Sequence, residues 1–416
     1  MCYSQGVKPI SGGPEFYPDL LGSRGDLTLF AARNRRSAGG ARGWTEPTEA
    51  QCVGSPEIFG PASGFSKAAA EKEAAAIFIP SGGFMDLTFT RPLAEQSSEI
   101  APYFSLRPNK SCDSGALDTY LWAEYYNTKI CIIKDRALLT IMQNGEEYFA
   151  AMPYCREEDL REYFELTKRY FNEVLKKPLK IYLADEEAVT ALSLMEDENF
   201  IVKEEFDFKD YLYDAEELRS LPGKKFHKKK NLVNKFMREY EGRWEYRTIR
   251  CEDKLLVWDF LDRWYEERAE TETEGEVSLE YEVKGIHEVL QNCFLIEHRI
   301  GGIFIDGRLE AFSIGAYNPR ERMACIDIEK GNPRIPGIYQ IINQQFLLHE
   351  FPEAKIVNRE DDVGLPGLRK AKESYNPIGF ERKYMVLQKD FAGYEKELTD
   401  QYEAEVRQYG SDAQDT

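Results

Sequence analysis

The segment from Ile326 to Tyr384 constrains the fold most strongly, because signals for strands, turns and helices alternate along it at short intervals. It begins with a strand-like run, passes through a turn rich in Pro and Gly into a helical pattern, and then repeats this order. Strands that alternate with helices are typical of α/β folds. Ionisable and amide residues collect at the element ends, where α/β proteins bind ligands. The segment therefore predicts a fold class and the place of a site.

The rest of the chain shows the same mixture of signals. Residues 157–175 place apolar side chains at i, i+3, i+4 and i+7, the pattern of an amphipathic helix. Asp185 is placed to cap the next helix, and Asp306-Gly307 separates two strand-like runs as a hairpin turn would. A chain of 416 residues is too long for one typical core. We therefore predict two α/β domains, over residues 85–210 and 211–390.

Three further segments flank or join these domains. Residues 1–84 hold 13 of the 30 glycines and 7 of the 19 prolines, and helical periodicity is poor before the Ala-rich run Lys67–Phe78. We expect a poorly ordered leader that need not belong to the working protein. Phe200–Tyr213, aromatic with alternating charges, is expected to be one linking strand. The acidic tail, residues 391–416, is expected to be an exposed helix.

The composition excludes several classes of protein. The eight cysteines are scattered without a Cys-x-x-Cys pair, which in a chain of this length indicates reduced, mostly buried thiols in the cytoplasm. No secretory signal is visible, and no apolar run approaches the roughly 18 residues of a membrane helix. The chain has no P-loop, dinucleotide-binding glycine motif or nucleophile elbow. Because the four histidines are dispersed, no metal site is expected.

A basic patch interrupts this strongly acidic chain. The net charge is −19, yet Leu221–Arg250 carries ten Lys or Arg residues against three Glu. Such a local reversal favours an anionic ligand, either a phosphorylated molecule or a nucleic acid. A solvated charged helix face is the alternative. The candidate binding residues of the patch are Lys224, Lys225, His227, Lys228, Lys229 and Asn231.

The turn from Asn332 to Gly337 leads directly into a helix. Backbone N–H groups at a helix start bind anions, and Gly337 would allow a close approach while Arg334 adds a positive side chain. The turn is therefore a candidate phosphate cradle, with Lys330 and Tyr339 beside it. The alternative is an ordinary strand-to-helix turn.

Five polar residues, Asn358–Asp362, follow the next strand, and charged groups there need partners or a ligand. A carboxylate at this place could hold an amine or act as a general base, although an internal ion pair is the alternative. Tyr375 ends the following helix, where its hydroxyl could face a cleft or simply lie in the core. The candidate catalytic residues are Glu329, Asp361 and Tyr375. The candidate binding residues of this half are Lys330, Asn332, Arg334, Gly337, Tyr339, Asn358, Arg359, Glu360, Arg369 and Lys370.

Four stretches carry a family resemblance: LPGKKFHKKKNLVNKF, LEAFSIGAY, IDIEKGNPRIPGIYQIINQQF and VNREDDVGLPGLRKAKESYNP. With them, residues 85 to about 390 resemble the bacterial family of the phosphatidylglycerol lysyltransferase C-terminal domain. The resemblance implies an α/β (α+β) fold of two tandem GNAT-like units with mixed sheets, related to the aminoacyltransferases that build peptidoglycan interpeptides. Nothing in the first 84 residues matches the family.

The resemblance also implies an activity. Such enzymes move an aminoacyl group from a charged tRNA to an amine or hydroxyl acceptor. By this resemblance Arg334 and Gly337 stand where GNAT enzymes bind pyrophosphate, with Tyr339 in place of the usual small residue. Tyr375 is similar to the GNAT tyrosine that protonates the leaving thiol, and Lys224–Lys230 correspond to a basic helix of the aminoacyltransferases.

Three functions follow as hypotheses. The first is a soluble aminoacyltransferase with charged tRNA as donor, whose chemistry needs positioning and a proton shuttle and no metal. The second is an N-acyltransferase that uses acyl-CoA, against which the bulk of Tyr339 weighs. The third is a GNAT-like protein that binds a small anion without turnover. The sequence identifies neither the acceptor nor the oligomeric state.

Overall fold

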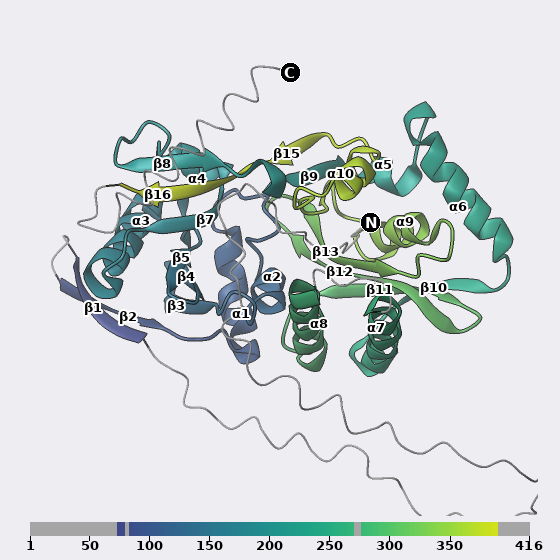
Figure 1. Ribbon diagram of the computed structural model, residues 1–416, viewed down its shortest axis with the longest axis horizontal. Coiled ribbons are helices and arrows are strands. Elements are labelled where there is room, and N and C mark those ends of the chain that lie inside the picture. The colour runs from purple at the N-terminus through teal and green to yellow at the C-terminus, as the bar shows by residue number, and fades with distance from the viewer. Residues whose placement is uncertain (1–72, 80–82, 270–275, 390–416) are drawn as a thin grey trace, which may run out of the picture. The chain divides into compact units, whose positions relative to one another are not determined.

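Two mixed β-sheets form the framework of the protein, and helices pack against both (Figure 1). The computed structural model describes residues 73–79, 83–269 and 276–389. The strands are β1 Glu73–Ile79, β2 Gly83–Phe89, β3 Lys129–Ile133, β4 Ala137–Asn144, β5 Glu147–Ala150, β6 Tyr154–Cys155, β7 Lys180–Asp185, β8 Phe200–Glu204, β9 Asp210–Asp214, β10 Trp244–Thr248, β11 Arg299–Ile305, β12 Arg308–Asn318, β13 Met323–Gly331, β14 Ile356–Asn358, β15 Gly379–Glu381 and β16 Lys383–Gln388. The α-helices are α1 Ser97–Ile100, α2 Ala116–Leu121, α3 Leu160–Arg169, α4 Glu186–Ala191, α5 Ala215–Ser220, α6 His227–Glu239, α7 Lys254–Ala269, α8 Glu276–Gln291, α9 Ile338–His349 and α10 Pro366–Glu373.

The C-terminal sheet has the strand order β10-β11-β12-β13-β14-β9-β15. Its neighbours are antiparallel except β13 and β14, which run parallel. Buried side chains of α5, α6 and α9 pack on one face, together with Ile303 and Ile326. Those of α7 and α8 pack on the other face, together with Phe312 and Ile328. Figure 1 shows α7 and α8 on one side of this sheet and α9 on the opposite side.

The N-terminal sheet has the order β3-β4-β5-β7-β16-β8, with β6 paired to β4. Its parallel pair is β5 and β7. Each sheet therefore contains antiparallel strands, then one parallel junction, then two more antiparallel strands. The predicted fold class, α/β with two mixed sheets, is confirmed. The matching strand orders are consistent with the two tandem units that the family resemblance implies.

The two sheets do not divide the chain at one point. Strand β16, Lys383–Gln388, comes last among the described residues, yet it lies between β7 and β8 of the N-terminal sheet. In the C-terminal sheet the equivalent place, after the parallel junction, belongs to β9. The prediction of a single linking strand over Phe200–Tyr213 is wrong. A short 3-10 turn at Phe206–Phe208 breaks this segment into β8 and β9, which belong to different sheets.

One hydrophobic core is common to both sheets. It contains Leu138 and Tyr154 from strands of the N-terminal sheet and Phe312 from the C-terminal sheet, with buried side chains of α2, α7 and α8 between them. Helices α2 and α8 approach closely, since a Cβ on Gly285 would lie 1.9 Å from the carbonyl oxygen of Leu121. This packing holds structures from the two halves of the chain against each other.

Local sequence signals are confirmed where they are strongest. Helix α3 lies within residues 157–175, between a 3-10 turn and a π-helical segment. Asp185 caps α4, its carboxylate accepting a hydrogen bond of 2.9 Å from the backbone N–H of Ala188. The turn between β11 and β12 is at Asp306 and Gly307, which both have positive φ, as a two-residue hairpin turn requires.

Most of the leader, residues 1–84, lies outside the described residues, as does the predicted tail helix over 391–416. The described part of the Ala-rich run is a strand rather than a continuation of a helix, because Glu73–Ile79 pairs antiparallel with β2. Strand β2 in turn buries Leu87 and Phe89 in the core of the N-terminal sheet.

The prediction that the cysteines are reduced is wrong for one pair. Cys251 and Cys293 form a disulfide, with their Cα atoms 5.8 Å apart, just before α7 and just after α8. No spacing in the sequence marks this pair, because the packing of the two helices brings the residues together. Four other cysteines are free and buried. No helix within the described ranges has the length and apolar character needed to cross a membrane.

Candidate functional site

The site forms where strands β13 and β14 separate. The two strands pair over three residues, from Met323↔Ile356 to Cys325↔Asn358, although β13 continues to Gly331. Ligands of open α/β sheets bind where neighbouring strands diverge at their carboxyl ends. Here the later residues of β13 and the loop after β14 supply the polar side chains of the site.

A β-bulge at Asp327 sends neighbouring acidic side chains in different directions. Ile314 of β12 pairs with Ile328, but Gly315 pairs with Ile326, so that Asp327 is the extra residue. Bulges re-aim side chains and occur beside functional sites. Glu329 lies beside α9, as its contact with Asn343 shows, whereas Asp327 lies near Asp118 of α2. Two separate polar clusters result.

The first is the Glu329 cluster, which we define as Lys229, Glu329, Arg359 and Tyr375. The guanidinium of Arg359 donates a hydrogen bond of 3.0 Å to the Glu329 carboxylate, and both residues are buried. The ring of Tyr375 lies between two cations: the Lys229 ammonium is 3.9 Å from its centroid and the Arg359 guanidinium 4.7 Å. Gln340 and Asn343 of α9 are buried nearby, and Asn343 donates to Glu329.

Burial gives two members of this cluster unusual acid–base properties. Loss of solvent and the neighbouring Arg359 guanidinium together lower the pKa of Lys229 to about 8, against the opposing effect of Glu329. Burial also raises the pKa of Tyr375 to about 12, although Arg359 acts in the opposite direction. Lys229 can therefore serve as a base near neutral pH, while Tyr375 stays protonated and can donate.

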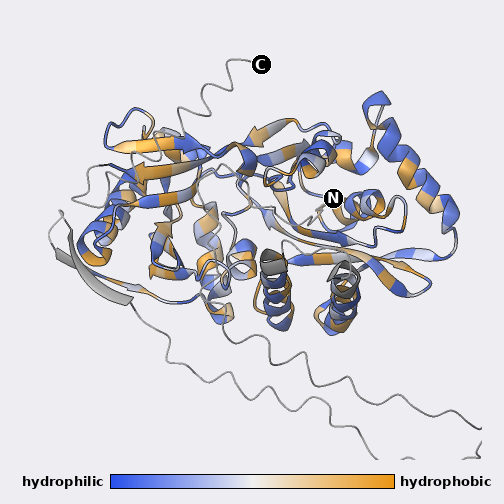
Figure 2. Cartoon of the chain, in the orientation of Figure 1, coloured by the Kyte–Doolittle hydropathy of each residue, from blue (hydrophilic) through white to orange (hydrophobic). Residues whose placement is uncertain are grey.

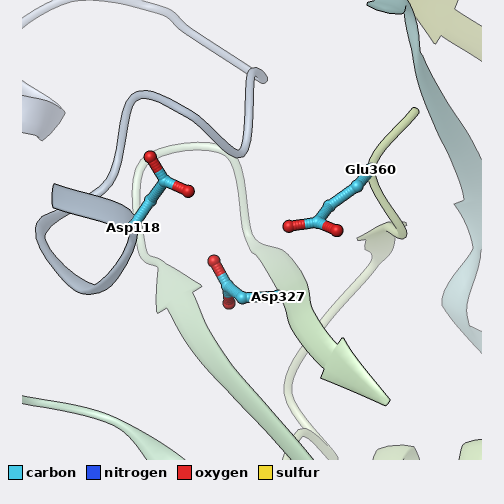
Figure 3. A group of neighbouring side chains, drawn as sticks. All are labelled: Asp118, Asp327 and Glu360. Atoms are coloured by element: carbon cyan, nitrogen blue, oxygen red, sulfur yellow. The ribbon is translucent and has the colours of Figure 1, made fainter. Parts of the chain in front are cut away.

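The second is the acidic cluster, which we define as Asp118, Asp327 and Glu360. One carboxylate oxygen from each lies within 4.8 Å of the others. Figure 3 shows the three side chains, from three separate segments, pointing toward a common space. Close by, the buried ammonium of Lys383 pairs with Asp113, with Asp210 at 2.7 Å and with Asp361 at 3.9 Å.

Burial makes this region hard to ionise completely. Burial, together with the carboxylates of Asp113 and Asp210, raises the pKa of Asp327 to about 7 against the opposing effect of backbone hydrogen bonds. The pKa of Asp361 is raised by burial to about 6, although Lys383 opposes the shift. The pKa of Asp118 is also raised well above its ordinary value, mainly by burial and then by its acidic neighbours. Raised pKa values from desolvation and like charges mark candidate functional sites.

The turn from Asn332 to Gly337 is held by contacts within the turn and with neighbouring elements of the fold. The amide of Asn332 donates to Glu310 at 2.9 Å, and the backbone N–H of Arg334 donates to the Asn332 side chain. Gly337 has φ of 90°, and a Cβ there would lie 2.7 Å from the carbonyl oxygen of Leu232 in α6. The close approach that this glycine permits is thus to a helix backbone. Arg334 itself is exposed.

Lys330 and Tyr339 have structural contacts. The Lys330 ammonium is 2.5 Å from Glu282 of α8 and 4.6 Å from the ring of Trp264. The Tyr339 hydroxyl donates to the carbonyl of Gly331 at 2.9 Å. Lys330 therefore faces helices α7 and α8, on the side of the sheet away from α9.

The basic patch lies on and just before helix α6. Its residues Lys224, Lys225, His227, Lys228 and Asn231 are exposed, and Lys225 pairs with Glu217 at 2.6 Å. Figure 2 shows α6 as a largely hydrophilic helix. Lys229 differs from its neighbours because it turns inward over Tyr375. A single helix thus carries an exposed basic surface and one member of the Glu329 cluster.

The remaining predicted binding residues occupy different surroundings. Asn358 is fully buried and donates to Asp210 at 2.8 Å and to the carbonyl of Lys110. Arg369 pairs with Asp362 and Asp207 at 2.7 and 2.6 Å. Lys370 is exposed. These residues do not connect the two clusters with each other, and they do not connect either cluster with the turn after β13. Their assignment as binding residues therefore remains a prediction.

A pocket opens beside the acidic cluster, on the N-terminal sheet. It encloses about 610 Å³ including its mouth, and Asp113, Asp118, Trp122, Tyr126 and Tyr182 are among its lining residues. Asp118 belongs to both the pocket and the acidic cluster. Sequence reasoning missed Asp118, Asp327 and Lys383, because residues 113–118, 327 and 383 lie far apart in the sequence and no motif joins them.

Comparison with known proteins identifies the family. The family model described as "Phosphatidylglycerol lysyltransferase, C-terminal" matches residues 105–387, more than half of the chain. The chain belongs to this family. The resemblance seen in the sequence is thereby confirmed.

Solved structures show the same fold. A conserved protein of unknown function from Bacteroides thetaiotaomicron is 25% identical, with a TM-score of 0.64 over 72% of this chain and 99% of that one. The C-terminal domain of a putative lysylphosphatidylglycerol synthetase from Agrobacterium fabrum is 14% identical, with a TM-score of 0.53 over 72% and 93%. L-PGS from Bacillus licheniformis is 15% identical, with a TM-score of 0.51 over 70% and 92%.

One curated relative matches a shorter part of the chain. The uncharacterized protein MYCGA3080 of Mycoplasmoides gallisepticum is 24% identical over 179 residues, which are 42% of this chain and 55% of that protein. The chain thus matches only about half the length of this relative. Its name assigns no activity.

Proposed function

We propose that the protein is an aminoacyltransferase that takes an aminoacyl group from a charged tRNA and passes it to an amine or hydroxyl acceptor, with the Glu329 cluster as its active site. One observation carries the proposal: helix α6 combines an exposed run of lysines with an inward Lys229 whose pKa is about 8. The exposed lysines suit the phosphates of a tRNA acceptor end. The inward lysine suits the proton transfer that aminoacyl transfer requires.

The reaction starts from an activated ester. The neutral amine of Lys229 removes a proton from the acceptor as its nitrogen or oxygen attacks the ester carbonyl carbon. The guanidinium of Arg359 stabilises the negative charge that forms on the carbonyl oxygen, and the Glu329 carboxylate holds that guanidinium in position at 3.0 Å. Because Glu329 and Arg359 are buried, they are positioned before the substrate arrives.

The leaving group is the terminal ribose hydroxyl of the tRNA. As the tetrahedral intermediate collapses, the ester C–O bond breaks and the Tyr375 hydroxyl donates its proton to the departing oxygen. The pKa of Tyr375, about 12, keeps this hydroxyl protonated until then. The proton held by Lys229 then returns to the phenolate, which restores both groups for the next turnover.

Acyl-CoA is the alternative donor, and its pyrophosphate would bind at the turn from Asn332 to Gly337. The packing of Gly337 against Leu232 speaks against this use, because the α6 backbone fills the space beside the glycine. Asp361, predicted as catalytic, contacts Lys383 in the other polar region, so we give the amine-handling roles to Glu329 and Lys229 instead.

The donor can be identified directly. The full chain is mixed with tRNA carrying labelled amino acids or with labelled acetyl-CoA, together with a panel of amine and hydroxyl acceptors, and label in the acceptor is counted. We expect transfer from tRNA, and loss of that transfer in Lys224→Ala/Lys228→Ala, which removes two exposed cations. Transfer from acetyl-CoA alone would refute the proposed donor, and transfer from neither would refute the proposed function.

A further inference from the structure

The acidic cluster has no role in the proposed reaction, yet its geometry is specific. Asp118 comes from α2, Asp327 from β13 and Glu360 from the loop after β14. One oxygen from each residue lies within 4.8 Å of the other two, and Figure 3 shows the side chains converging. Three carboxylates at such separations repel one another strongly unless a cation or protons neutralise them.

A second observation is independent of the clustering. The Oδ2 atom of Asp327 is buried and has no hydrogen-bond partner, and the residue as a whole is only 5% exposed. An orphaned carboxylate oxygen in the interior is costly. The bulge in β13 aims this side chain toward Asp118 and Glu360, so that the backbone N–H groups of Asp327 and Ala316 leave its Oδ2 atom unsatisfied.

The ammonium groups of the nearby lysines bond directly to other residues. Lys383 is bound to Asp113, Asp210 and Asp361. The ammonium of Lys372 donates to the backbone carbonyls of Arg359 and Asp361. Among the described residues, no lysine or arginine forms an ion pair with Asp118 or Asp327.

We propose that Asp118, Asp327 and Glu360 bind a hard divalent cation, with calcium preferred over magnesium. Carboxylate oxygens are the ligands that such ions prefer, and separations of no more than 4.8 Å allow all three to reach one ion. Calcium accepts the irregular geometry of carboxylates from three separate segments, whereas magnesium demands a near-ideal octahedron and gives up its water reluctantly. The pocket beside Asp118 provides an entry path and room for water ligands.

The cation would also connect separate parts of the chain. Asp118 lies on a helix of the N-terminal half, whereas Asp327 lies in β13 and Glu360 follows β14 of the C-terminal sheet. Binding to the folded chain and not to the unfolded one stabilises the fold by mass action. At a concentration one hundred times Kd, we expect the midpoint of thermal unfolding to rise by about 5 °C.

The test uses the full chain after treatment with EDTA. Isothermal titration with CaCl2, MnCl2 and MgCl2, and separately with n-butylamine as a primary ammonium, measures affinity and stoichiometry. Thermal unfolding is followed in parallel by circular dichroism. We expect one calcium ion per chain, bound at least tenfold more tightly than magnesium, and no saturable binding of the amine.

Two variants locate the site, and a third variant serves as a control. Asp327→Asn and Asp118→Asn keep the side-chain shape but remove a ligand charge, so each should lower calcium affinity at least 30-fold and abolish the thermal shift. Because Asp327→Asn also relieves repulsion, it should unfold at a higher temperature than the parent chain in EDTA. The exposed Glu146→Gln should behave like the parent. Binding of n-butylamine in place of metal, no metal binding at all, or calcium binding that survives both variants would overturn the proposal.

Discussion

Lys229 offers the sharpest test of the proposed reaction, because its pKa is lowered from 10.5 to about 8. At pH 7 about 9% of such a lysine is neutral, compared with about 0.03% of an ordinary one, a gain in free base of about 300-fold. If Lys229 is the base, kcat/KM for aminoacyl transfer should rise about tenfold per pH unit below pH 8 and level off above it. Initial rates with saturating acceptor, corrected for spontaneous ester hydrolysis, measure this profile between pH 6 and 9.

Substitution separates the base from the basic surface. Lys229→Met removes the amine and Lys229→Arg keeps a charge that cannot be given up, so each should lower kcat/KM by about 10²- to 10⁴-fold and abolish the rise near pH 8. Lys230→Met is the matched control, since Lys230 is the exposed neighbour on the same helix. It should change KM for tRNA by less than tenfold and leave the profile intact. A flat profile in the parent, or full activity in Lys229→Met, would refute the assignment.

The same shift has a consequence for stability. Between pH 8 and 10.5 the unfolded chain holds a proton on Lys229 that the folded chain has lost. The free energy of unfolding should therefore rise with pH across this window, by an amount that solvent access to Lys229 reduces.

Three further predictions concern the fold. Arg359→Met should lower the free energy of unfolding by about 3–5 kcal/mol in urea titration, because the buried Glu329 carboxylate then loses this guanidinium; a loss below 1 kcal/mol would contradict this view of the pair. Gly337→Ala should cost about 1–3 kcal/mol through its positive φ and its contact with α6, whereas Gly367→Ala, which meets open space, should cost nothing; equal effects would exclude the packing explanation. Asp185→Ala should cost about 3–5 kcal/mol, because it removes the cap of α4 and strips both hydrogen bonds of 2.6 Å from a buried arginine, and a stability within 1 kcal/mol of the parent would refute that reading.

Much of the fold could be predicted because its signals are local. The turn at Asp306-Gly307, the cap at Asp185 and the apolar period of α3 each lie within a few residues, and each is found as expected. The prediction of one strand over Phe200–Tyr213 is wrong because the pairing of this segment is not local. Its two halves pair with strands far away in the sequence, and nothing within the segment marks the change of sheet.

The candidate site could be predicted only in part. The polar run after β14 includes Arg359, which the structure places in the Glu329 cluster, but strict alternation along a strand would put Asp327 and Glu329 on one face. The bulge that separates them depends on pairing with β12, which no local pattern encodes. Likewise the run of lysines in the basic patch gave no reason to single out Lys229, whose environment comes from Tyr375 about 150 residues later.

The place of β16 has a consequence for how the protein is made. Strands β7 and β8 each pair with β16, so during synthesis both expose unsatisfied edges until Lys383–Gln388 has left the ribosome. The N-terminal half therefore cannot complete its folding before nearly all of the described chain has emerged, unlike halves that fold in the order of synthesis. Release of a chain stalled shortly before residue 383 would yield an aggregation-prone fragment, which is a natural substrate for chaperones and proteases.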